Sequence, residues 1–135
     1  MWRAIVAYAG DRQVADDAVA EAFARAIRDR GSIQDVRAWT WRVAFRLAAD
    51  ELRARERPGA TDAPAAIETS SDAADLLAAL RRLPEHQRLA VLLHDYADRP
   101  TAEVAAILRC STATVHVHLS RGRKRLRELL EISHA

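Results

Sequence analysis

The sequence is poor in cysteine, glycine, proline and aromatic residues, and it contains no long apolar run. Cys110 is the single cysteine among 135 residues, so no internal disulfide can form and a reducing cytoplasm is the expected location. No apolar run approaches the roughly 18 residues of a membrane span, and no leader pattern opens the sequence. We therefore expect a soluble protein without membrane insertion.

The residues that are abundant favour helix. Alanine, leucine, arginine and glutamate dominate, and alternating β-branched runs are missing, so the expected fold class is all-α. The net charge of +2 is small but unevenly distributed. Residues 58–80 contain acidic residues and no lysine or arginine, whereas residues 81–135 have a surplus of cations. This asymmetry indicates a basic binding segment joined to the rest by an acidic spacer.

The most informative stretch is a short amphipathic helix, a tight turn and a longer basic helix. The first helix is expected over 101–109 and the second over 112–130, with Ser111 as the N-cap of the second. The apolar stripe of the second helix follows helical spacing and comprises Val115, Leu119, Gly122, Leu126 and Leu129. Two such helices predict a helix-turn-helix whose second helix has a polar face free for a major groove.

The outward positions of the second helix suit DNA. Small and hydrogen-bonding side chains occupy its first half: Thr112, Ala113, His116, Val117 and Ser120. Cations follow in its second half: Arg121, Arg123, Lys124, Arg125 and Arg127. This order fits base-edge reading followed by phosphate neutralisation. The plain alternative is a solvated basic helix end, which the helix dipole favours in any case. We prefer DNA binding, because the basic run directly follows a short helix and a capped turn.

Two longer helices are expected in the first half of the chain, with Asp11 and Asp35 as their N-caps. In the helix over 11–30, Val14, Ala18, Phe23 and Ile27 should form the buried stripe. In the helix over 35–57, the expected core stripe is Val36, Trp39, Val43 and Leu47. A second apolar patch, Trp41, Phe45 and Leu52, lies around the other side of that helix. Either another helix covers this patch, or the patch is exposed and binds a partner.

The order of several short motifs resembles a known family. The motifs are Asp16-Asp17-Ala-Val-Ala-Glu21-Ala-Phe23, then Arg37-Ala-Trp39-Thr-Trp-Arg-Val-Ala and Leu47-Ala-Ala-Asp50-Glu-Leu52-Arg53, then, after a linker, Leu83-Pro84-Glu-His-Gln87-Arg88 and Arg121-Gly-Arg123-Lys124-Arg125-Leu126. Together they resemble a small bacterial sigma factor of the extracytoplasmic-function (ECF) type, over nearly the whole chain.

The resemblance implies two small helical domains and a linker. Residues 1–57 would form a region-2-like unit of three helices, 58–71 the linker, and 72–135 a region-4-like unit of four helices. The implied polymerase-binding residues are Asp16, Asp17, Ala20, Glu21 and Arg25. Those for the downstream promoter element are Ser32, Gln34, Arg42, Arg46 and Arg53, with Arg55 and Arg57 as further cations. Those for the upstream element are Ser111, Thr112, Ala113, His116, Val117, Ser120, Arg121, Arg123 and Lys124.

Several residues depart from the family pattern. Ala20 stands where glutamine is common, Phe45 and Arg46 replace an Arg-Asn pair, and Arg109 replaces the glycine of the turn. His116 and His118 stand where cations are common, which should lower electrostatic affinity for DNA. The first helix is also much shorter than in the family.

Three functions follow, in order of preference. The first is a sigma subunit that needs RNA polymerase core to bind promoter DNA. The second is a sigma-like regulator that binds DNA without core, as a homodimer through Trp41 and Phe45. The third is an interaction protein that binds core or an anti-sigma factor without reading DNA.

Enzymatic and metal chemistry are not expected. The sequence has no nucleotide loop, nucleophile motif or cofactor fingerprint. His116 and His118 are two residues apart on a helix and do not share a face, so we do not expect them to form a metal site with Cys110. The expected set of cofactors is therefore empty.

Overall fold

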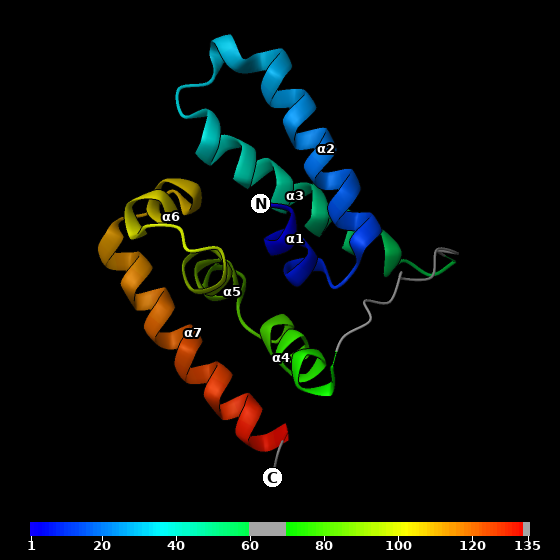
Figure 1. Ribbon diagram of the computed structural model, residues 1–135, viewed down its shortest axis with the longest axis vertical. Helices are drawn as coiled ribbons and strands as arrows, with labels where there is room; N and C mark the ends of the chain where they lie inside the picture. The colour runs from blue at the N-terminus through cyan, green and yellow to red at the C-terminus, as the bar shows by residue number, and fades with distance from the viewer. Residues whose placement is uncertain (60–69, 134–135) are drawn as a thin grey trace. The chain divides into compact units, whose positions relative to one another are not determined.

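The computed structural model describes residues 1–59 and 70–133, and within these ranges the chain is helical without strands (Figure 1). The expectation of an all-α fold is confirmed. Contacts divide the chain into two compact units, Met1–Ile67 and Glu68–Ala135. Most of the predicted linker falls on residues 60–69, which lie outside the described residues. None of the described helices has the length and apolarity that crossing a membrane would need.

The first unit consists of α1 (Trp2–Ala9), α2 (Arg12–Asp29), a short 3₁₀ turn η1 (Arg30–Ser32) and α3 (Val36–Arg55). Gly10 ends α1 in the left-handed conformation, with φ of 67°. Asp11 and Asp35 cap α2 and α3, because each side chain accepts a hydrogen bond of 3.1 Å from the third following backbone N–H. These two caps are confirmed as predicted.

Small residues, not large ones, form the buried face of α2. Ala15, Ala18, Ala22 and Ala26 are buried with Val14 at helical spacing. Phe23 and Ile27 were expected in this stripe, but they are 48% and 75% exposed, so that part of the prediction is wrong. The alanines bring α2 close to its neighbours, and the larger side chains are left on the outer side of the helix.

The prediction of an exposed partner patch on α3 is also wrong. Trp41 and Phe45 are 5% and 4% exposed. Tyr8 of α1 lies edge-on to Phe45 with ring centroids 5.2 Å apart, and Trp41 stacks on Phe45 at 5.8 Å. Leu52 is half-buried. The short α1 therefore covers this patch, and the alternative in which a neighbouring helix covers it is confirmed.

The face of α3 predicted as its core is only partly buried. Val43 is buried, Trp39 and Leu47 are half-buried, and Val36 is 37% exposed. Because α1 and α2 cover the side that carries Trp41 and Phe45, the other side of α3 is left partly open.

The second unit contains α4 (Ser71–Arg81), α5 (Glu85–Val91), a π-helical turn η2 (Leu92–Tyr96), α6 (Thr101–Leu108) and α7 (Thr112–Ser133). Ser70 caps α4, because its Oγ accepts a hydrogen bond from the N–H of Ala73 at 3.3 Å. The long α7 packs against α4, α5 and α6 (Figure 1). The predicted stripe of α7 is confirmed, because Val115, Leu119, Gly122, Leu126 and Leu129 are all buried.

Candidate nucleic-acid interface

The turn between α6 and α7 is built by three residues. Arg109 ends α6 in the left-handed conformation, with φ of 56° and ψ of 47°. The N–H of Cys110 then donates to the carbonyl of Ala105 at 3.1 Å. Ser111 Oγ accepts from the N–H of Thr114 at 3.1 Å, which confirms Ser111 as the N-cap of α7. The backbone thus has a helix-turn-helix connection although the left-handed position is arginine and not glycine.

The residues predicted to read base edges are on the free side of α7. Thr112, Ala113, His116, Val117 and Ser120 are all exposed. They precede the cations along α7, so the start of the helix offers small and hydrogen-bonding groups while the following turns offer charge.

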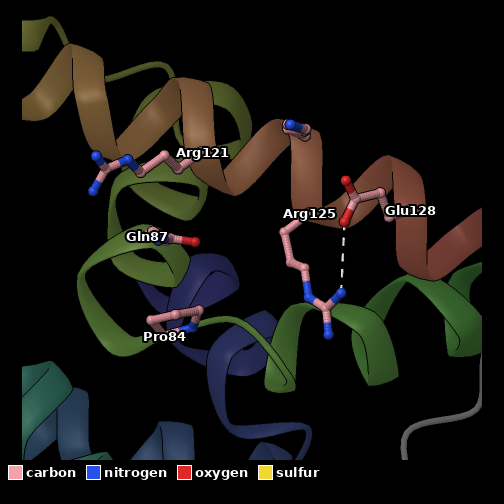
Figure 2. A pocket seen from close by; sticks show the side chains of 6 residues that line it. Pro84, Gln87, Arg121, Arg125 and Glu128 are labelled. Carbon is pink, nitrogen blue, oxygen red and sulfur yellow. Dashed lines mark ion pairs between the residues drawn. The ribbon is translucent and has the colours of Figure 1, made fainter.

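The cations divide between the two edges of α7. On one edge, Arg121, Lys124 and Arg125 line a shallow pocket of about 330 Å³ together with Pro84, Gln87 and Glu128 (Figure 2). Arg125 pairs with Glu128 at 3.5 Å. No ion-pair partner for Arg121 or Lys124 occurs among residues 1–59 and 70–133. This edge therefore has unneutralised positive charge suited to a phosphate.

Arg123, on the other edge, is engaged within the protein. Its Nε donates to Asp95 Oδ2 at 2.9 Å and its Nη2 donates to Asp95 Oδ1 at 2.6 Å. This hydrogen-bonded pair raises the pKa of Arg123 and lowers that of Asp95. Sequence reasoning assigned Arg123 to DNA and did not identify Asp95, which follows no motif and lies 28 positions away in the chain.

His118 lies beside α5 and is half-buried. Its ring is edge-on to His86, with centroids 5.4 Å apart. Burial lowers the pKa of His118 below its ordinary value of 6.5, and the charges of His86 and Arg121 lower it further. His116, in contrast, is exposed on the side that would face DNA.

The predicted polymerase-binding residues share an exposed surface of α2. Asp16, Asp17, Ala20 and Glu21 are exposed and Arg25 is half-buried. Local contacts hold the polar ones in place: Trp2 Nε1 donates to Asp16 at 2.7 Å, Gln13 donates to Asp17 at 2.9 Å, and Glu21 pairs with Arg25 at 2.8 Å. The surface is acidic and ordered.

The residues predicted for the downstream element lie on η1, the following loop and α3. Ser32 and Gln34 are exposed, and Ser32 Oγ donates to the carbonyl of Asp29 at 2.9 Å. Arg46 and Arg53 are exposed, Arg42 is half-buried, and helical spacing places all three on one face of α3. Arg53 pairs with Asp50.

Trp39 lies on that same face of α3 and is half-buried. Sequence reasoning placed it in the core, because its spacing from Val36 and Val43 matches an apolar stripe. Its position among arginines makes it a candidate stacking surface for an unpaired base.

Arg55 is not available as the DNA cation that the sequence suggested. Its Nη1 donates to Asp11 at 2.6 Å and its Nε to Glu51 at 3.2 Å. The side chain of Asp11 is 2% exposed and that of Arg55 16% exposed. This pair therefore joins the end of α3 to the start of α2.

Metal binding has no support in the described ranges. Across 1–59 and 70–133, no three His, Cys, Asp or Glu side chains are grouped to hold a metal ion. Burial raises the pKa of the Cys110 thiol, which disfavours the thiolate that a metal would need.

Fold and site together define a protein of two all-helical units with a helix-turn-helix in the second. Residues 73–126 match the family described as sigma-70, region 4. Over 128 residues, or 82% of this chain, the sequence is 39% identical to the ECF RNA polymerase sigma factor SigJ of Mycobacterium tuberculosis, of which the match covers 41%. It is 34% identical over 128 residues to the ECF RNA polymerase sigma factor SigM of the same species, covering 86% of this chain and 64% of the relative. The chain is similar to ECF sigma factors over most of its length, and its helix-turn-helix unit matches sigma-70, region 4.

Solved structures share this fold. The sigma factor RpoE, solved in complex with the anti-sigma factor NepR from Bartonella quintana, matches with a TM-score of 0.75 at 24% identity, covering 97% of this chain and 89% of that one. CnrH, solved in complex with the cytosolic domain of CnrY, matches with a TM-score of 0.76 at 22% identity, covering 97% of this chain and 80% of that one. The chain spans about half the length of the first curated relatives that it matches.

Proposed function

We propose that this chain is a transcription initiation factor that binds RNA polymerase core through α2 and directs it to promoter DNA through α3 and α7. Residues 1–57 would serve the core and the downstream element, and 72–135 the upstream element. An anti-sigma factor is a further proposed partner, since the structural neighbour RpoE was solved with the anti-sigma factor NepR.

One observation carries this proposal. The capped turn at Ser111 leaves an exposed row of proposed base-reading residues on α7, followed by Arg121 and Lys124, for which the described ranges contain no ion-pair partner. A phosphate-binding edge next to a base-reading face is the arrangement that positions a helix in a major groove. The match to sigma-70 region 4 covers this same stretch.

The first experiment tests core binding. The chain is titrated with RNA polymerase core, and the variant Asp17→Lys/Glu21→Lys is compared with Asp72→Lys/Glu131→Lys, which changes the net charge equally on exposed residues of the second unit. Loss of binding only in the first variant supports the proposal. Unchanged binding in both variants contradicts the role of α2.

The second experiment tests promoter reading. Core and the chain transcribe a library of random upstream sequences, and the initiating templates are sequenced. Ser120→Ala/Arg121→Gln should abolish the upstream sequence preference that the unmodified chain shows. Equal preference in both would favour the interaction protein that does not read DNA.

The dimeric regulator is disfavoured by a specific observation. Its dimer surface would be formed by Trp41 and Phe45. Both side chains are buried inside the first unit, where Tyr8 of α1 packs against Phe45. A core-independent role would be supported if the chain alone bound duplex DNA with the sequence preference that it shows together with core.

A further inference from the structure

The pair between Arg123 and Asp95 joins the DNA-facing helix to the helix behind it. Two hydrogen bonds of 2.9 and 2.6 Å run in parallel between the guanidinium and the carboxylate. Both side chains are partly exposed, 44% for Arg123 and 36% for Asp95. The pair therefore lies at the protein surface, at the edge of the face that α7 presents.

Close packing fixes the geometry of this pair. Asp95 is one turn after Val91, and Val91 Cγ2 would lie only 2.9 Å from a Cβ at Gly122, the neighbour of Arg123. With the backbones so close, the short aspartate side chain reaches the guanidinium directly. Bidentate pairing of this kind is stronger than a single charged contact and restricts the arginine to one orientation.

The pair determines which cations of α7 are available to bind DNA. Arg121, Lys124 and Arg127 are exposed, and none has an ion-pair partner within the described part of the chain. Arg123 sits among them in sequence, but its charge is matched by Asp95. A phosphate approaching Arg123 would meet the negative charge of the carboxylate beside it.

We propose that Asp95 limits the affinity of α7 for the DNA backbone, because it holds Arg123 away from phosphates and so lowers sequence-independent affinity. The inference rests on the proposed function of α7. Phosphate contacts provide nearly all non-specific binding, while base-edge contacts provide discrimination. Removing one phosphate contact therefore weakens sequence-independent binding and makes it less dependent on salt.

The test uses the full chain and a labelled duplex of random sequence, with binding followed by fluorescence anisotropy over a series of salt concentrations. Asp95→Asn should bind this duplex more tightly, and its plot of log K against log salt should steepen by about 0.9, the value for one added phosphate contact. Asp95→Asn/Arg123→Gln should return to the slope of the unmodified chain.

A second comparison does not depend on the folding of Asp95→Asn. With Asp95 in place, Arg123→Gln should leave the salt slope unchanged. Lys124→Gln should make the slope shallower by about 0.9, the value for one lost phosphate contact. Equal loss of slope in Arg123→Gln and Lys124→Gln would overturn the inference while leaving DNA binding by α7 intact. If no variant binds the duplex as a free chain, the same variants are compared as complexes with RNA polymerase core, and identical salt slopes for all of them there would overturn the inference.

Discussion

Gly122 sets how closely α7 approaches α5. A Cβ at this position would lie 2.9 Å from Val91 Cγ2 and 3.3 Å from the carbonyl oxygen of Gln87. Val91 is buried and β-branched, so it cannot turn away easily. We expect Gly122→Ala to lower the free energy of unfolding by up to about 2 kcal/mol, since the helix-propensity gain of about 1 kcal/mol offsets only part of an overpacking cost of about 1–3 kcal/mol.

Urea unfolding followed by far-UV circular dichroism measures this change. Gly31→Ala is the matched control, because a Cβ there would meet nothing within 4 Å. A Gly122→Ala protein as stable as the unmodified chain would mean that the two helices can separate without cost.

His118 should make the second unit less stable in mild acid. Its folded-state pKa lies below 6.5 because of burial, then the charges of His86 and Arg121. The unfolded chain therefore takes up a proton at a higher pH than the folded chain does. Stability from this group is fully present above about pH 6.5 and is lost as the pH falls from there through the lowered folded pKa.

The measurement is the urea midpoint at pH 7.5 and pH 5.5. The His118→Gln variant should lose less stability on acidification than the unmodified chain. The His116→Gln variant, changed at an exposed position of the same helix, should lose as much as the unmodified chain. The same acid sensitivity in the unmodified chain and His118→Gln would assign the effect to other groups.

At the scale of elements, Asp11 performs two tasks at the start of α2. One oxygen caps the helix at Val14 N–H, 3.1 Å away, and the other accepts from Arg55 at 2.6 Å. We expect Asp11→Ala to cost about 2–4 kcal/mol, from a lost cap of about 1 kcal/mol and an Arg55 left without its buried partner.

Asp11→Asn separates the two contributions, because asparagine caps as well as aspartate but has no charge. Asp35→Ala supplies the cap-only reference: Asp35 caps α3 over the same 3.1 Å distance. If Asp11→Ala and Asp35→Ala lower the free energy of unfolding by the same amount in chemical denaturation, the ion pair of Asp11 with Arg55 contributes nothing to stability.

The sequence was sufficient for elements whose signal is local. The caps Asp11, Asp35 and Ser111 and the stripe of α7 follow from side-chain chemistry and spacing within one helix. The faces of α3 could not be assigned this way, because both are apolar and the choice depends on where α1 lies. Phe23 was misplaced for a similar reason: the neighbouring alanines allow close packing that excludes it. Asp11, which pairs with Arg55, and Asp95, which pairs with Arg123, belong to other elements of the chain, and no local pattern indicates either pair.

At the scale of the whole molecule, the two compact units predict two separate unfolding transitions. All three tryptophans, Trp2, Trp39 and Trp41, belong to the first unit, so their fluorescence reports that unit alone. Circular dichroism reports the helices of both units. If each unit folds on its own core, the two probes should give different urea curves.

Phe45→Ala tests this division. Phe45 is buried between Tyr8 and Trp41, so truncation should destabilise the first unit by about 3–5 kcal/mol. The fluorescence transition should then move to lower urea, while the part of the dichroism curve that belongs to the second unit stays in place. Gly122→Ala changes only the contact between α5 and α7, so it should shift the dichroism transition of the second unit and leave the fluorescence transition in place. Coincident curves that shift together in both variants would mean that the chain unfolds as one cooperative structure, and that each variant weakens both cores at once.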